Sequence, residues 1–438
     1  MNNKLKFNIY FSFIEKIFII FSQFFSSIII AKHLPREEFG SLAVVAGVFA
    51  FLQVFNITFE NIVLRDFLKT ATNTSKMMSQ FLMMNILKVV GLFFLASGVA
   101  FYFYFKDGRL LFVYTCLIFF LVMAMDILVS PFVIYASTVF KQKIVTKISI
   151  VRWTLNVLFL APLVLYPTLK ILIVKDCLIL IVILLLWSVA IKKELHLEIL
   201  FEKIDWAFFK DGLLRYSLWT HLIGVFSSII YKADALILYY FVSLEVIGNY
   251  NIALTVANVA SVLPGILLYQ NSVALAHCKE EDEARILTGT MLRLSLYLGG
   301  ICYLGFIFLG KPFFALITQN NNAELYFYLM YIVSGVLIVK MIISPLVSYI
   351  NIRGDVKMLF LRVQLPLLIL VLLNYILFSF LFGAKGAAIS NLVNGLIWLG
   401  LILFEIRRYG FKISDMGSFC NDFKKLKKYV KKVRSVHS

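Results

Sequence analysis

The sequence is poor in charge and in the residues that build catalytic and metal sites. Only 15% of its 438 residues are charged and five are histidine, whereas about 25% of a soluble domain is charged. It has no GxxxxGK[ST] loop, which excludes ATP hydrolysis by this chain, and no HExxH, CxxC or His/Asp cluster for a metal. We therefore expect no enzyme activity, no cofactor and no metal ion.

Cysteine is also scarce. The five cysteines are odd in number, follow no disulfide or metal-ligand spacing, and lie mostly inside apolar runs. They are predicted to be small apolar packing residues.

Apolar residues are abundant instead, at 61% of the chain. A helix needs about 17–25 mostly apolar residues to cross a bilayer. Runs of that length predict an all-α polytopic membrane protein with about twelve transmembrane helices, at 8–31, 40–64, 81–105, 110–135, 144–166, 170–191, 213–241, 245–272, 290–317, 325–350, 357–381 and 386–406. Residues 8–31 are interpreted as a retained helix, because no small-residue cleavage site follows them.

The net charge of +18 raises the possibility of nucleic-acid binding, which the distribution of the charge excludes. With the N-terminus inside, 29 of the 42 Lys and Arg residues fall on the inside and seven on the outside. Inside segments of inner-membrane proteins carry this excess. We expect both termini to be cytoplasmic, with membrane lipids as partners and residues 407–438 as a basic tail.

An internal repeat predicts two similar halves. The text ILVSPFVIYAS (127–137) aligns with MIISPLVSYIN (341–351), and LPREEFG (34–40) aligns with VSLEVIG (242–248). We expect six-helix bundles at 1–191 and 213–406, joined by an amphipathic linker at 192–212. They are expected to be related by a pseudo-two-fold axis along the membrane normal, with a central cavity between them.

Polar residues inside the predicted helices are the candidate site, because charge in a bilayer is costly. The candidates for the substrate cavity are mostly cations, which favours an anionic cargo such as a diphosphate; they are Lys16, Lys88, Arg152, His221, Lys232, Asn258 and Lys340. The candidates for gating or ion coupling are Glu15, Glu60, Asp126 and Asp234. The repeat offset pairs Asp126 with Lys340, and we expect a salt bridge or a shared substrate contact between them.

Four segments carry a resemblance to a known family: LPREEFGSLAV (34–44), KADALILYYFVSLEVIGNYNIALTVANVASVLP (232–264), SPLVSYINIRGDVK (344–357) and FGAKGAAISNLVNG (382–395). In order and spacing the chain resembles the O-antigen flippases (Wzx-type) of the multidrug/oligosaccharidyl-lipid/polysaccharide exporter superfamily. The match departs from that pattern at Gly40-Ser41-Leu42, where the family usually has Gly-x-Tyr.

The resemblance implies alternating access and a cargo of undecaprenyl-diphosphate-linked oligosaccharide, moved to the periplasmic leaflet of the inner membrane. A polysaccharide polymerase and a chain-length regulator are the implied protein partners. Two alternatives stay open: a multidrug or cation antiporter of the same fold, which would need an acidic cavity, and a membrane glycosyltransferase or polymerase, which would need a large outside loop.

Overall fold

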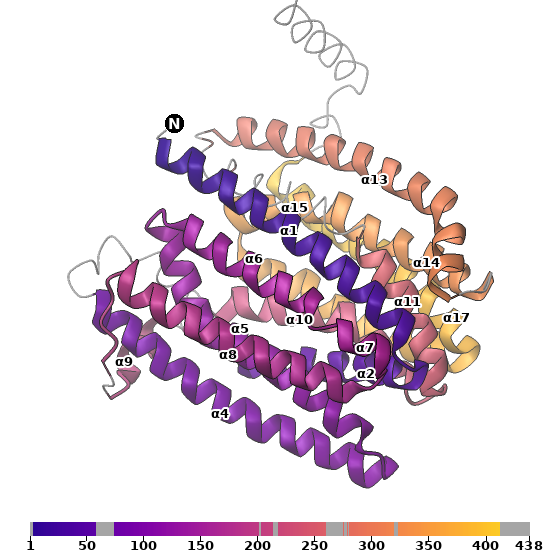
Figure 1. The fold of residues 1–438 in the computed structure, drawn as a ribbon. Coiled ribbons are helices and arrows are strands. Elements are labelled where there is room, and N and C mark those ends of the chain that lie inside the picture. Colours follow the sequence, from indigo (N-terminus) through magenta and orange to yellow (C-terminus); the bar gives the residue numbers. More distant parts are fainter. Residues whose placement is uncertain are drawn as a thin grey trace, which may run out of the picture.

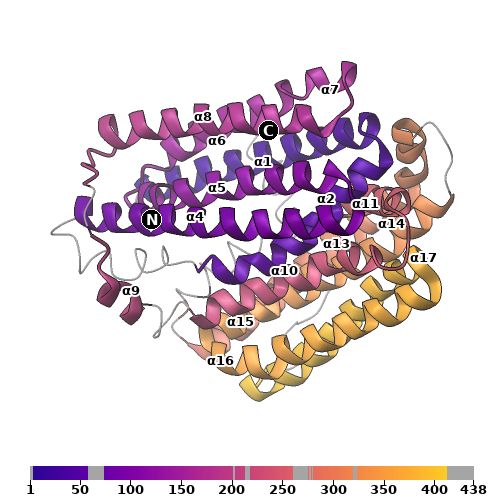
Figure 2. The ribbon, with the colours of Figure 1, turned by 90° about the horizontal axis from the view of Figure 1, so that it is seen from below.

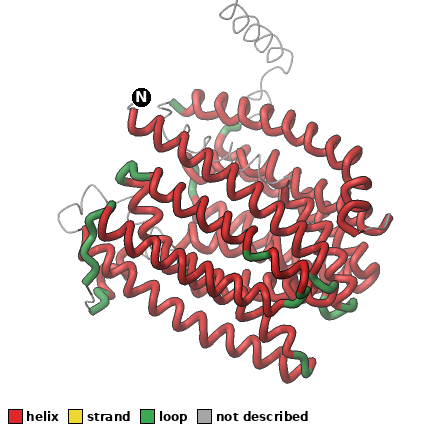
Figure 3. The backbone as a smooth tube through the Cα atoms, in the orientation of Figure 1, coloured by secondary structure: helices red, strands yellow, loops and turns green. Residues whose placement is uncertain are grey.

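A computed structural model of the chain describes residues 3–57, 74–200, 203–212, 218–259, 275, 278, 280–318 and 323–411. These residues are almost entirely helical, and the short loops lie at the helix ends (Figure 3). Runs of Leu, Ile, Val and Phe form helices here, because a helix satisfies its backbone polar groups without water. An all-α polytopic membrane fold is confirmed.

The first half of the chain forms one bundle of helices (Figure 1). Its elements are α1 (Asn3–His33), α2 (Arg36–Leu52) with the short turn η1 (Gln53–Phe55), α4 (Thr74–Asp107), α5 (Leu110–Thr138), α6 (Gln142–Leu158), α7 (Ala161–Leu165) and α8 (Leu169–Lys193). Pro162 is the second residue of α7, just after α6 ends, because proline fits the first turn of a helix but not its interior.

The second half forms the other bundle. Its elements are α10 (Leu218–Leu238), α11 (Leu244–Val259), α13 (Glu281–Thr318), α14 (Ala323–Leu337), η4 (Ile338–Ile343), α15 (Ser344–Arg353), α16 (Val356–Leu359), η5 (Phe360–Gln364), α17 (Leu365–Ile406) and η6 (Arg407–Tyr409). The π-helical turns η4 and η5 end just before Pro345 and Pro366. A proline ring clashes with the carbonyl four residues earlier, and a wider π turn relieves that clash.

Each of the twelve predicted membrane segments is largely helical wherever the structure describes it. Eight helices in the described residues are long and apolar enough to span a membrane. The longest, α17, is a hairpin of two arms, because Gly383 has a φ of 56° within it. Hydrogen bonds from Asn374 to Asn394 and from Tyr375 to Asn391 join the arms, which confirms the predicted break between residues 381 and 386.

The two bundles meet mainly through α2, which packs against α10 and α11. We call the end of the molecule with the connections at 33–36 and 238–244 the gate end, and the opposite end, near residues 194–205, the linker end. Figure 2 shows the bundles close together where α2 and α11 begin, and spreading apart toward α9 (Trp206–Gly212) and α16. The molecule is thus closed at the gate end.

Two glycines produce this closure. A Cβ atom at Gly40 would lie 2.1 Å from the carbonyl oxygen of Leu244, and a Cβ atom at Gly248 would lie 2.1 Å from that of Arg36. The repeat pairs Gly40 with Gly248 and Arg36 with Leu244, so each contact is the counterpart of the other. The pseudo-two-fold axis therefore passes through this crossing of α2 and α11.

The predicted linker lies against the first bundle. Its backbone is held by three polar side chains at the start of α4: Ser75 accepts from Glu198 N, Ser79 accepts from Leu200 N, and Gln80 bonds to both Lys203 and Asp205. Within the described part of the segment, α8 ends at Lys193 and residues 206–212 form a short helix, α9, whose Phe209 is buried against Phe81. The described residues between these two helices form an irregular strap along the first bundle.

Candidate functional site

An ion pair joins α5 and α6 in the first bundle, with the acid exposed. Arg152 of α6 donates to Asp126 of α5, with 2.7 Å between Nη1 and Oδ1. Lys340 lies instead over the ring of Tyr231, with Nζ 4.8 Å from the centroid. The predicted salt bridge between Asp126 and Lys340 is therefore wrong in this conformation, because Asp126 has a closer cation in its own bundle.

A second ion pair is buried next to the first. Lys175 and Asp176 of α8 lie 2.8 Å apart, and both side chains are more than nine-tenths buried. Lys175 also donates to Asn156 of α6, which donates to Ser26 of α1. These bonds tie three helices together around a site of nearly zero net charge, so Arg152 and Lys175 are largely neutralised by neighbouring acids.

Glu15 is buried between α1 and α6. Its two carboxylate oxygens accept from Gln142 Nε2 at 2.7 Å and from Ser149 Oγ at 2.8 Å. Both donors are neutral. Among the described residues, the Glu15 carboxylate is therefore held by hydrogen bonds from neutral groups and not by an ion pair.

Asp234 of α10 lies at the centre of the second bundle and is 0% exposed. Its carboxylate accepts from Tyr250 Oη of α11 at 2.6 Å and from the backbone of Ala235. Tyr250 in turn accepts from Asn391 of α17. A buried carboxylate held only by neutral groups is a functional candidate inside a membrane.

Lys232 and Lys340 differ from the other candidate cations. Neither forms a salt bridge within the part of the chain that the structure describes. Lys232 is exposed although its neighbours Ala233 and Asp234 are buried, and it lies where α10 crosses α2, its carbonyl beside Gly47. The Lys232 side chain therefore points out of the helix packing near the junction of the bundles.

The remaining candidates are more scattered. His221 of α10 is buried, with Nε2 3.2 Å from the carbonyl oxygen of Val54, and Lys88 of α4 is near enough to influence it electrostatically. Asn258 is exposed near the end of α11. Glu60 and the side chain of Lys16 lie outside the described residues.

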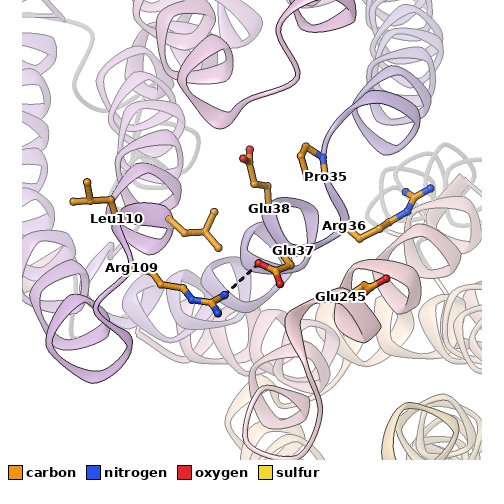
Figure 4. A pocket seen from close by; sticks show the side chains of 8 residues that line it. Pro35, Arg36, Glu37, Glu38, Arg109, Leu110 and Glu245 are labelled. Atoms are coloured by element: carbon orange, nitrogen blue, oxygen red, sulfur yellow. Dashed lines mark hydrogen bonds and ion pairs between the residues drawn. The ribbon is translucent and has the colours of Figure 1, made fainter.

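A cavity of about 600 Å³ opens at the gate end and is lined from both bundles. Figure 4 shows Arg109 reaching Glu37 at 3.2 Å, with Glu38 beside them and Glu245 presented from α11. Glu38 is also fixed, because its Oε2 accepts from the backbone of Leu169. The sequence reasoning treated this region as a loop and missed its charge pairing.

Solved structures show what kind of protein has this architecture. The lipid II flippase MurJ in an inward closed conformation matches with a TM-score of 0.69 and 15% identity, over 93% of this chain and 89% of that one. The chain shares its fold with this flippase. An inward-facing MATE multidrug transporter of the MOP superfamily matches with a TM-score of 0.69 and 12% identity, over 89% of this chain and 95% of that one.

A MATE transporter of Vibrio cholerae matches less closely, with a TM-score of 0.54 and 11% identity, over 92% of this chain and 97% of that one. No family profile and no curated protein sequence matches the chain. At these identities the likeness establishes the fold, and the function must be argued from the residues.

Several interior polar residues escaped the sequence reasoning. Lys175 and Asp176 are adjacent, so their charges offset each other in any helix-by-helix scan. Tyr250, Asn391 and Glu405 bind across helices, and only their spacing on apolar helices could have singled them out.

Proposed function

We propose that this protein is a flippase for oligosaccharides linked to a lipid through a diphosphate, such as an undecaprenyl-diphosphate-linked O-antigen unit. The observation that carries the proposal is the pair Lys232 and Lys340, cations inside the membrane helices without a carboxylate partner in the described structure. An unpaired charge facing hydrocarbon is not tolerated. Lysines that lack a carboxylate partner in the protein can bind the negatively charged diphosphate of the cargo.

The shape of the molecule supports this proposal. The bundles separate toward the linker end, which the charge distribution assigns to the cytoplasm, where lipid-linked sugars are assembled. The two sides of the junction also differ: α2 packs along α10, whereas α1 meets α11 over a much smaller contact. A side opening between α1 and α11 would let the lipid tail stay in the bilayer while the head group enters.

The acids are proposed to couple transport to an ion gradient. Glu15 and Asp234 are the favoured coupling residues, because the donors to their carboxylates in the described structure are neutral, while Arg152 keeps Asp126 in an ion pair. Glu60 remains a proposed coupling residue on its sequence position alone. We also propose that both termini are cytoplasmic. The resemblance implies a polysaccharide polymerase and a chain-length regulator as protein partners.

The test is flipping of an undecaprenyl-diphosphate-linked oligosaccharide in proteoliposomes. Replacing Lys232 or Lys340 by Gln should reduce the rate by about tenfold or more, because a hydrogen bond to a charged group contributes about 1.5–3 kcal/mol. Lys143→Gln, which removes an exposed lysine at the linker end, is the matched control and should retain the wild-type rate.

The same vesicles separate the flippase from the alternatives. A multidrug antiporter would move a lipophilic cation against a proton gradient, and removing positive charge at Lys232 should then maintain or increase that transport. A deletion strain of a flippase should accumulate lipid-linked sugar facing the cytoplasm, whereas loss of a polymerase would leave single units facing the periplasm. Absence of both flipping and accumulation would exclude the proposal.

A further inference from the structure

A row of polar side chains follows one face of the second arm of α17. Asn391, Asn394, Trp398 and Glu405 recur at spacings of three, four and seven residues, which places them on the same side of the helix. Asn394 and Trp398 are 5% exposed and Glu405 is 1% exposed. The row therefore runs through the interior of the second bundle rather than along its lipid surface.

The turn η5, which precedes the first arm, brings two more polar residues to this end of the hairpin. Glu405 faces Arg362 across the hairpin, with 3.6 Å between their charged atoms. Gln364 is half a turn further along and is 1% exposed, which places it between the levels of Glu405 and Trp398. Polar groups thus follow one another at intervals of about one or two helical turns.

These side chains have polar atoms that the protein does not satisfy. Gln364 Oε1, Asn394 Nδ2, Trp398 Nε1 and both carboxylate oxygens of Glu405 are buried and have no hydrogen-bond partner among the described residues. A buried polar atom is costly if it stays unsatisfied. Four of these atoms lie along the row on α17, which indicates a place where water is bound.

The two ends of the row suit a path for protons. At one end, Asn391 connects through Tyr250 to the carboxylate of Asp234, with Tyr375 as its other neighbour. At the other end, Glu405 lies between Arg362 and Arg408, whose side chains are nearly half exposed at the linker end. Distances of 3.6 and 3.7 Å leave these contacts longer than direct hydrogen bonds, which allows water to bridge them.

We propose that the α17 hairpin encloses a water-filled proton path that connects the linker end of the molecule to Asp234. A proton from the aqueous phase binds the Glu405 carboxylate and passes between water molecules held by Trp398 and Asn394 to the hydroxyl oxygen of Tyr250. Tyr250 takes up this proton as its own hydroxyl proton moves to the Asp234 carboxylate. Only O–H bonds form and break. The charged and titratable groups facing the two acids are Arg362 and Arg408 at Glu405, and Tyr250 and Tyr375 at Asp234.

The path deepens the ion coupling proposed for Asp234, and it can be tested without any cargo. In nanodiscs, an infrared difference spectrum after a pH step should contain a carboxylic acid band that Asp234→Asn removes. Glu405→Gln and Trp398→Phe should slow the appearance of that band by at least about tenfold, equivalent to about 1.4 kcal/mol of added barrier, and leave its final amplitude unchanged. Trp398→Phe keeps an aromatic ring and removes the N–H donor, so it tests the path with little change in packing.

Glu198→Gln, the same change at an exposed carboxylate of the linker, is the matched control and should keep the wild-type rate. An unchanged rate in both path variants, or an Asp234 band that never titrates, would overturn the proposal. A normal proton path in a protein that flips no lipid-linked sugar would instead count against the flippase alone.

Discussion

Gly40 and Gly248 show how closely single atoms control the contact between the bundles. Gly40→Ala places a methyl group against the backbone of Leu244, and backbone cannot move aside as a flexible side chain can. We expect this change to lower the thermal midpoint of the detergent-solubilised protein by several degrees, because overpacking costs about 1–3 kcal/mol.

Gly98→Ala is the control for that measurement. Gly98 is helical, and a Cβ atom added there would have no other atom within 4 Å. Alanine is favoured over glycine in a helix by about 1 kcal/mol. Gly98→Ala should therefore keep or raise the midpoint. Equal effects of the two substitutions would show that the close approach of α2 and α11 does not limit stability.

The sequence shows which helices carry charged residues, but it does not show which side chains those residues contact. Asp126 and Asp234 stand out in the sequence, because a charge on an apolar helix is conspicuous; the side chain of Asp126 is 54% exposed, whereas Asp234 is buried. Their partners depend on helix rotation and on which neighbour is closest, and the repeat offset gave the wrong one for Asp126. Lys175 was missed because its charge is offset by Asp176, next to it in the chain.

Helices were predictable at the scale of the element, since the length of an apolar run translates directly into a membrane crossing. The linker was less so. Its position depends on Ser75, Ser79 and Gln80 of α4, more than a hundred residues earlier in the chain. No local pattern in residues 192–212 reveals that support.

The strap can be released experimentally. Gln80→Leu keeps the side chain volume but removes the bonds to Lys203 and Asp205. We expect faster amide hydrogen exchange at Asp205, whose N–H loses its acceptor, and faster proteolysis near Lys203.

Ser188→Ala, at an exposed serine that bonds only within α8, should change neither measurement. Unaltered exchange at Asp205 in Gln80→Leu would show that the packing of Phe209 holds the strap by itself.

At the scale of the whole molecule, the contacts predict opposite movements at the two ends. The gate end is held by the α2–α11 crossing and by Lys106 of α4, whose Nζ lies 4.4 Å from the ring centroid of Tyr239 and 4.5 Å from that of Tyr240. No comparable packing joins α9 or α16 to the other bundle among the described residues. When the gate end opens, the two bundles should therefore move closer together at the linker end.

Spin labels can test this exchange in a background without the natural cysteines. A pair at positions 170 and 243 reports on the gate end, and a pair at 143 and 357 reports on the linker end; the residues replaced are all exposed. As the conformation changes, the first distance should lengthen while the second shortens. Distances that change in the same direction would contradict alternating access.

The paired contact of Gly40 and Gly248 also bears on how such a chain could arise. An interface in which each side presents the same residues to the other is the kind that two identical subunits form. A six-helix ancestor that paired with its own copy would have needed only one glycine to make both contacts. After duplication and fusion the two halves could diverge, and here one half kept two ion pairs around Arg152 and Lys175 while the other surrounded Asp234 with neutral partners.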